Sequence, residues 1–370
     1  MRVLMTCHTG FDLDSGACGC TVNIGKNLQT FGISVDYYTH SDLPESLGVR
    51  LKHCLFAFFV YGHVQRFKKW DVVDATTADT WILGKMRGKE KKPKIVVSSH
   101  GLEHIFEEKR VIYEKKTSWR YRSWAYLNLK LVESTLRSAD HIVVLTQNEK
   151  EYIKTNFSIP QERISVVYHS LPEYFKNLPE YRLPDEFKIL FVGNWIQRKG
   201  GRYLLEALEN LCSDNIDFSV TLAGLRATKE SSLKREMSDR LWERVRFIRF
   251  LENSALPQLY LSHSVFVFPS FYEGFGMVLT EAMAAGIPII TTRAGIAEEW
   301  IRDKVNGIIV PYGDSQAIYK ALVWAFKHPD EMRNCGRNAK DLIHKVDQGQ
   351  EAKQRMDIYE RLINCNSSSV

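Results

Sequence analysis

The sequence predicts an α/β protein made of two consecutive doubly wound domains, each with a parallel sheet covered by helices on both faces. Short apolar runs typical of buried strands alternate with helical stretches along the chain, and this alternation pauses once, over 171–186. The chain of 370 residues is also too long for one ordinary core, and it suits two domains of about 150–200 residues each.

The first domain is expected over 1–170. Its predicted strands are the runs RVLMTC, SVDYYT, WDVVDAT, KIVVSSH and ADHIVVLT. We expect a glycine-rich loop, GACG, after the first strand, and then a helix over TVNIGKNLQTFG that stops at Gly32. Ligands of such sheets bind beyond the carboxyl ends of the strands, so the loops that follow strands are the candidate site.

The segment 171–186 is expected to be the interdomain linker, because its three prolines disfavour a helix. The second domain is expected over 187–346. Its predicted strands are FKILFVG, FSVTLAG, RVRFIRF, VFVFPS, IPIITT and GIIV, and GGRYLLEALENL is a predicted helix. The C-terminal stretch 347–365 reads as one amphipathic helix, which either caps the second domain or, as we expect, packs back on the first.

The composition is that of a globular protein, with 44% hydrophobic and 25% charged residues. Seven scattered cysteines do not form a disulfide framework and fit a reducing compartment. The N-terminus does not read as a signal peptide, and the longest apolar run, residues 54–61, is far shorter than the roughly 20 residues that span a bilayer. We therefore expect a cytoplasmic protein.

Positive charge is concentrated in one part of the chain. Residues 51–130 hold 17 basic and 8 acidic residues, a net charge of +9 against +6 for the whole chain. Within this part, 51–70 and 115–130 combine aromatic and basic residues, which suits peripheral contact with the inner face of a membrane. The alternative is an amphipathic helix packed on its own sheet. No recognition motif accompanies the basic residues, so a nucleic-acid partner is not expected.

Two loops that follow predicted strands carry the groups that an anionic ligand needs. After FKILFVG, Arg198 and Lys199 stand beside two glycines just before a helix, and this arrangement suits a diphosphate. After VFVFPS, the stretch EGFG leads into a helix expected to begin near Met277, whose first amides can bind an anion. Glu273 precedes that helix and Glu281 lies about one turn inside it. This spacing suits a long ligand such as a nucleotide sugar, whose hydroxyl groups flank a pyrophosphate.

These motifs resemble those of the retaining glycosyltransferases of family 4. The most specific are FVGNWIQRKG and FPSFYEGFGMVLTEAMAAGIPIITT, and the similarity continues in SSHGLEHIFEE, ADHIVVLTQNEKEYI, ISVVYHSL and VNGIIVPYGD. The resemblance implies the GT-B fold, in which two Rossmann-like domains face a cleft, with the acceptor on the side of the first domain and the nucleotide sugar on the second.

The resemblance also implies roles for individual residues. Glu281 would bind the donor ribose, and Glu273 would hold the transferred sugar, which His100 would approach from the first domain. Lys199 and Arg198 would neutralise the leaving diphosphate. The remaining residues implied in donor binding, largely through their backbone, are Gly16, Gly19, Asn194, Leu251, Gly274, Phe275, Gly276, Met277 and Val278.

The chain departs from the family pattern at two positions. Asn194 stands where many members have an arginine, and Arg198 is the residue expected to compensate for it. His169-Ser170 stands where many members have Asn-Gly.

The activity implied by the resemblance is retaining transfer of a hexose-type sugar from a UDP- or GDP-sugar. The acceptor would be a glycan or a lipid-linked molecule in the synthesis of cell-surface polysaccharide or glycolipid. No metal or cofactor is expected, because cations and a helix N-terminus already face the diphosphate, and Asp12 and Asp14 are not expected to bind a metal. Two alternatives remain: a nucleotide-sugar epimerase or hydrolase on the same fold, and a non-catalytic binding subunit.

Overall fold

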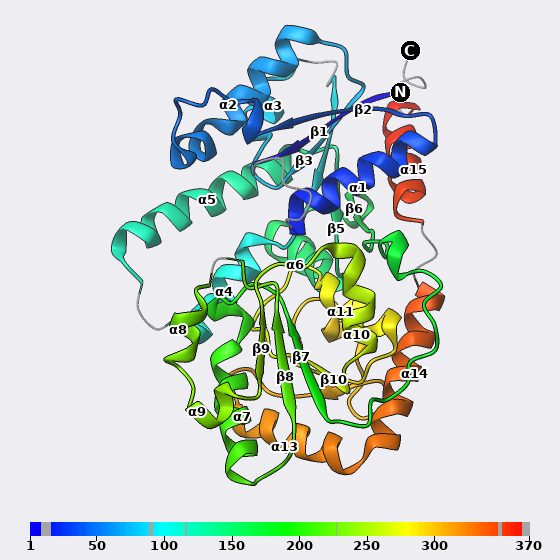
Figure 1. Cartoon of the computed structure of the whole chain (residues 1–370). Helices are drawn as coiled ribbons and strands as arrows, with labels where there is room; N and C mark the ends of the chain where they lie inside the picture. The colour runs from blue at the N-terminus through cyan, green and yellow to red at the C-terminus, as the bar shows by residue number, and fades with distance from the viewer. Residues whose placement is uncertain (9–15, 89–91, 115–116, 227, 347–349, 365–370) are drawn as a thin grey trace. The chain divides into compact units, whose positions relative to one another are not determined.

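The computed structural model describes residues 1–8, 16–88, 92–114, 117–226, 228–346 and 350–364. The chain divides into two compact units (Figure 1). The first unit contains residues 1–107, 116–170 and 349–370, and the second unit contains 108–115 and 171–348. The sequence had assigned 108–115 to the first domain, whereas the structure groups these residues with the second unit.

The first unit is built on a six-stranded parallel sheet with the order β2-β1-β3-β4-β5-β6. Its strands are β1 (Arg2–Cys7), β2 (Ser34–Thr39), β3 (Val72–Thr76), β4 (Lys94–Ser98), β5 (His141–Val144) and β6 (Ile164–Val166). The first five coincide with the predicted runs. Most of their residues are buried, because helices cover both faces of a parallel sheet. The strand order changes direction between β1 and β3, which makes the carboxyl ends of these two strands the switch point of this sheet.

The helices of the first unit connect successive strands, except for the C-terminal helix, and α4 runs on into residues of the second unit. They are α1 (Gly16–Thr30), α2 (Val49–Phe67), α3 (Trp81–Met86), α4 (Glu103–Tyr113), α5 (Trp119–Ser138), α6 (Gln147–Phe157) and α15 (Glu351–Asn364), with short 3-10 turns at His40–Asp42 and Gln161–Arg163. Among the described residues, no helix is both long and apolar enough to cross a membrane.

The glycine-rich segment GACG was expected to be a loop, and this prediction was wrong. Residues 16–19 form the first turn of α1, which ends at Thr30. Gly32 follows with φ +76°, at the expected stop position. Cys18 explains the difference, because its side chain is buried against Cys7 and Val22 and so gives this turn a contact with the end of β1. Gly16 and Gly19 are therefore helical residues.

The C-terminal helix α15 belongs to the first unit, where it packs against α1. Ala352, Ile358 and Tyr359 of this helix join the same core cluster as Val3 and Leu28. A segment more than 300 residues away in the sequence therefore completes the core around β1.

The second unit holds another six-stranded parallel sheet, with the order β12-β11-β10-β7-β8-β9. Its strands are β7 (Lys188–Val192), β8 (Ser219–Ala223), β9 (Val245–Ile248), β10 (Val265–Phe268), β11 (Ile289–Thr291) and β12 (Ile308–Ile309), each within a predicted run. The strand order changes direction between β7 and β10, so the loops that follow these two strands flank the switch point, where such sheets bind ligands.

The helices of the second unit connect its strands and then close the unit with two longer helices. They are α7 (Gly201–Ser213), α8 (Glu230–Lys234), α9 (Asp239–Trp242), α10 (Leu256–Leu261), α11 (Met277–Ala285), α12 (Ala297–Trp300), α13 (Ser315–Lys327) and α14 (Pro329–Val346). Short 3-10 turns lie at Glu173–Phe175, Gln197–Lys199 and Asn253–Ala255.

Candidate functional site

The loop after β7 is held in a tight conformation that places two cations at the switch point of the second unit. Gly200 has φ +70°, and a Cβ atom there would lie 2.1 Å from the carbonyl oxygen of Pro269, at the end of β10. The Phe271 amide donates to the Arg198 carbonyl at 2.8 Å. Only glycine fits so close a backbone contact, and so the loops after β7 and β10 are locked together around Arg198 and Lys199.

Glu273 is the common partner of these two cations. Its carboxylate is buried, with 8% exposure. The Lys199 Nζ lies 2.8 Å from Glu273 Oε1, the Arg198 Nη1 lies 3.4 Å from Oε2, and Ser270 donates a further hydrogen bond. Burial on its own would raise the pKa of Glu273, but Lys199 and Arg198 outweigh it, and the pKa is lowered. Glu273 is therefore a carboxylate in a positively charged environment.

The start of α11 presents backbone amides beside this ion pair. Gly276, with φ +100°, precedes the helix, as expected from the sequence. A second glycine, Gly295, lets the loop after β11 approach, because a Cβ there would lie 2.3 Å from the Phe275 carbonyl oxygen. The Ile296 amide donates to that oxygen at 2.8 Å. The helix N-terminus, with its partial positive charge, is thus fixed next to Glu273.

Glu281 lies one turn further into α11 and is buried, with 6% exposure. The Tyr260 hydroxyl of α10 donates to its Oε2 at 3.0 Å. Burial raises the pKa of Glu281 to about 7, which the hydrogen bond from Tyr260 opposes. The two glutamates of the motif therefore differ: Glu273 is held ionised by cations, whereas Glu281 titrates near neutrality and can accept hydrogen bonds from a polar ligand.

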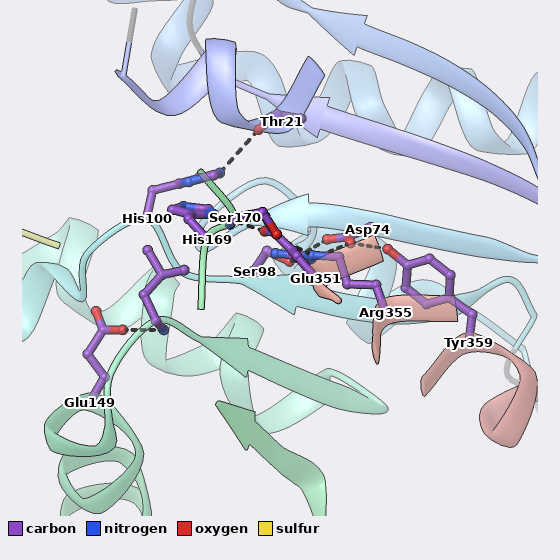
Figure 2. A network of polar contacts seen from close by, with 11 residues as sticks. Thr21, Asp74, Ser98, His100, Glu149, His169, Ser170, Glu351, Arg355 and Tyr359 are labelled. Atoms are coloured by element: carbon purple, nitrogen blue, oxygen red, sulfur yellow. Dashed lines mark hydrogen bonds and ion pairs between the residues drawn. The ribbon is translucent and has the colours of Figure 1, made fainter. Parts of the chain in front are cut away.

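His100 follows β4 in the first unit and contacts two other elements (Figure 2). Its Nε2 lies 3.1 Å from Thr21 Oγ1 of α1, and its ring stacks on that of His169, with centroids 5.8 Å apart and planes inclined by 22°. Burial is the largest of the causes that hold the pKa of His100 well below 6.5, followed by His169 and Arg355. His100 is therefore a neutral imidazole near pH 7.

A second polar group in the first unit escaped the sequence-based prediction. His8, directly after β1, places its Nδ1 3.0 Å from Asp79 Oδ1 and 2.8 Å from Thr76 Oγ1. Asp79, which follows β3, also accepts from Thr6 at 2.9 Å. These residues lie at the switch point between β1 and β3. Their position after strands was a usable signal, but no motif accompanied it.

The other predicted residues lie in both units. Asn194 lies two residues after β7, Leu251 lies between β9 and the turn at Asn253–Ala255, and Gly274 precedes α11. Gly16 and Gly19 lie in α1 of the first unit. The second unit thus brings together Asn194, Arg198, Lys199 and residues 273–281 at one sheet edge, while His100 belongs to the first unit.

The structure offers no evident metal site in the part of the chain that it describes, where no group of three or more His, Cys, Asp or Glu side chains is arranged to hold an ion. Asp12 and Asp14, which were not expected to bind a metal, lie outside the described residues.

Two family models match the chain over most of its length. Residues 20–172 match "Glycosyltransferase Family 4", and residues 175–342 match "Glycosyl transferases group 1". Among curated proteins, the O-antigen chain mannosyltransferase B of Escherichia coli is 28% identical over 212 residues, which is 52% of this chain and 53% of that protein. The chain spans 59% and 53% of the length of the first curated relatives that it matches.

Solved structures match nearly the whole chain at low sequence identity. Sucrose-phosphate synthase from Thermosynechococcus elongatus superposes with a TM-score of 0.79 at 18% identity, covering 99% of this chain and all of that one. HepE of Anabaena, in complex with UDP and glucose, has a TM-score of 0.73 at 18% identity, covering 98% of this chain and all of that one. With both halves matched by family models and both sheets found in these neighbours, the chain belongs to glycosyltransferase family 4 and has the GT-B fold.

Proposed function

We propose that this protein transfers a hexose-type sugar from a UDP- or GDP-sugar to a glycan or lipid-linked acceptor, with retention at the anomeric carbon and without a metal ion. The proposal rests on one observation: at the switch point of the second unit, Lys199, Arg198 and Glu273 lie beside the N-terminus of α11. The O-antigen mannosyltransferase and the UDP complex of HepE support this class of acceptor and donor.

The donor diphosphate is proposed to bind at the N-terminus of α11, through the amides near Gly276 and Met277 and through Lys199 and Arg198. Glu281 accepts hydrogen bonds from the ribose hydroxyls, and Glu273 accepts them from the sugar. Because Lys199 contacts Glu273, the same ammonium group would link the carboxylate that holds the sugar to the phosphate that leaves.

The reaction forms a bond between the acceptor oxygen and the anomeric carbon and breaks the bond from that carbon to the phosphate oxygen. The departing electron pair goes to the nucleoside diphosphate, where the fixed cations and the helix dipole stabilise it without reorganisation. We propose that a diphosphate oxygen takes the acceptor proton on the same face of the sugar, which gives retention. His100, as a neutral ring with one donor and one acceptor, is the contribution of the first unit to holding the sugar.

The helices α2 and α5 are proposed to contact an anionic membrane surface. Exposed apolar side chains on them stand beside basic residues, with the Arg120 guanidinium over the Trp119 ring and the Lys130 ammonium over the Tyr126 ring. The short helix α3 packs against both α2 and α5, so the two helices belong to one side of the first unit (Figure 1). An acceptor with a lipid anchor would be presented at such a surface.

A donor screen followed by product analysis tests the function. UDP- and GDP-sugars are compared by thermal shift, and the stabilising donor is incubated with EDTA, with and without candidate lipid-linked and glycan acceptors. Transfer to an acceptor in EDTA, with the anomeric configuration conserved by NMR, supports the proposal. Free sugar or an epimer formed from the donor alone indicates the hydrolase or epimerase, and binding without turnover indicates a non-catalytic subunit.

A further inference from the structure

The C-terminal helix α15 carries a polar network that reaches the ring of His100 in the first unit (Figure 2). Glu351, at the start of the helix, accepts a hydrogen bond from His169 Nδ1 at 2.9 Å and another from the Ser170 amide at 3.0 Å. All three residues are buried. His169 in turn stacks on His100. The contacts form one continuous path from α15 through the loop after β6 to His100.

The base of this network is anchored in the sheet. One turn after Glu351, Arg355 donates to Asp74 Oδ2 of β3 at 2.9 Å and to Ser98 Oγ of β4 at 2.8 Å. Tyr359, a further turn along, donates to the same carboxylate. Because Arg355 and Asp74 are almost fully buried, α15 can occupy only one register on the sheet, and this register fixes where Glu351 meets His169.

The backbone on both sides of His100 is also fixed. Glu149 of α6 accepts from Ser99 Oγ at 3.0 Å and from the Leu102 amide at 2.7 Å. With this segment held, the ring of His100 has two neighbours that decide its orientation, Thr21 on one side and His169 on the other.

We propose that His169, held by Glu351, is a positioning residue for His100: a charged imidazolium that stacks on the His100 ring and keeps that ring neutral and fixed in plane for contact with the sugar. The inference rests on the proposed function, in which His100 contacts the transferred sugar. A neutral His100 offers a ring nitrogen that accepts a hydrogen bond from a sugar hydroxyl, and protonation would remove it.

The charges around this histidine pair support the assignment. Burial alone would lower the pKa of His169, but the neighbouring Cys20 and Glu351 outweigh it and raise the pKa to about 10. The groups that act on the two rings are Cys20 and Thr21 of α1, His8 after β1, and Glu351 and Arg355 of α15. Positive charge on His169, Arg355 and His8 disfavours a second proton on His100.

The test is an NMR titration of His100 in the full-length protein labelled at the histidine ring carbons, with the His100 signal assigned from its loss in His100→Asn. In the wild type, we expect the His100 ring to remain neutral to well below pH 6.5. In His169→Asn the titration midpoint should rise by about one pH unit, because the stacked charge is gone. Glu351→Gln keeps the size of the side chain and removes the charge that helps to keep His169 protonated. With less positive charge on His169, the His100 midpoint should shift in the same direction.

Tyr359→Phe is the matched control, because it removes a hydrogen bond from the same network without changing the charge near His100. Its His100 midpoint should equal that of the wild type. An unchanged midpoint in both His169→Asn and Glu351→Gln, with both variants folded by circular dichroism, would overturn the proposal. If one of the two variants fails to fold, the other decides the question alone. If neither folds, the His100 midpoint is measured in His169→Gln instead.

A kinetic readout separates this inference from the proposed function. Glu281, with its pKa of about 7, sets the upper part of the low-pH limb of kcat/KM for sugar transfer in every variant. The steeper part at lower pH, where His100 also gains a proton, should move to higher pH in His169→Asn and stay in place in Tyr359→Phe. If His100→Asn keeps full transfer activity, the role of His100 in the proposed function fails, whereas the NMR shift still reports whether His169 sets its protonation.

Discussion

The Lys199 ammonium lies 2.8 Å from the Glu273 carboxylate, although the two residues are proposed to contact different parts of the donor. Burial lowers the pKa of Lys199, and its attraction to Glu273 opposes that effect. A neighbouring cation, Arg198, lies 3.4 Å from the same carboxylate. This pairing fixes the lysine side chain at the switch point, so little side-chain freedom remains to be lost on donor binding.

Replacing Lys199 with alanine should lower kcat for sugar transfer by about a hundredfold or more, because one fixed cation no longer stabilises the departing diphosphate. Initial rates at saturating donor measure the effect. The control is Arg202→Ala, which removes an 83% exposed cation two residues from Gly200, and its kcat should match the wild type. Wild-type turnover in Lys199→Ala would exclude this role for the lysine.

Glu281→Gln should change stability and nucleotide affinity in opposite directions. The folded pKa of about 7 exceeds the ordinary 4.5, so the folded state holds more protons than the unfolded state between these values, and stability falls as the pH rises through this window. Glutamine removes that loss, so the variant should be stabilised by up to roughly 2–3 kcal/mol at pH 8 and not at pH 4.5.

The same substitution should weaken nucleotide binding by about tenfold or more at pH 8, because a neutral amide accepts ribose hydroxyl hydrogens less strongly than a carboxylate. Calorimetric titration with UDP and GDP measures this. Unchanged affinity for both nucleotides would show that Glu281 does not contact the ribose, and the absence of any pH-dependent gain in Tm would contradict the buried, protonated state of the carboxyl group.

Runs of buried apolar residues predicted all the strands of the second unit and five of the six in the first unit, because strands buried on both faces read as continuous apolar runs. The family resemblance pointed to the sixth, within ISVVYHSL. The sequence also predicted the start of α11, where the EGFG segment leads into a helix. Its error at residues 16–19 came from reading glycines as a loop, whereas the burial of Cys18 makes this segment a helical turn.

The side-chain pairings of the site could not be predicted in the same way. The contact of Arg355 with Asp74 joins residues 281 positions apart, and nothing in one sequence identifies such partners. One signal was present: Asp74 interrupts the apolar run VVDAT, and a carboxylate buried in a central strand requires a cationic partner. The Lys199–Glu273 pair was missed because the two residues were assigned to separate parts of an extended ligand.

Gly200→Ala should destabilise the second unit more than Gly32→Ala destabilises the first. Both glycines have a positive φ, of 70° and 76°, so both substitutions carry the conformational cost of about 1–2 kcal/mol. Only at Gly200 would the new Cβ meet a backbone atom, 2.1 Å away, whereas at Gly32 nothing lies within 4 Å. Chemical denaturation of both variants measures the difference, and equal losses would contradict the close approach of the loops after β7 and β10.

Arg355→Met should cost about 3–5 kcal/mol of stability, because it leaves the Asp74 carboxylate buried without its cation. Tyr359→Phe removes one hydrogen bond to the same carboxylate and should cost about 1–2 kcal/mol. Urea denaturation gives both values. The double variant Asp74→Asn/Arg355→Met should lose less stability than the sum of the losses in Asp74→Asn and Arg355→Met measured separately. Strict additivity of these losses would show that Asp74 and Arg355 are not coupled.

Replacing apolar side chains on α5 should weaken membrane binding without affecting the fold. Trp119, 73% exposed, and Leu127, also exposed, lie beside basic residues that favour an anionic surface. We expect Trp119→Ser/Leu127→Ser to reduce sedimentation with phosphatidylglycerol vesicles about tenfold, because the favourable free energy of transferring the two apolar side chains into the membrane interface is lost. Phe326→Ser, which removes an exposed ring from α13 of the second unit, is the control and should bind as the wild type does. Equal binding of all three proteins, or binding that persists on phosphatidylcholine alone, would show that this face of α5 packs elsewhere and does not recognise an anionic membrane.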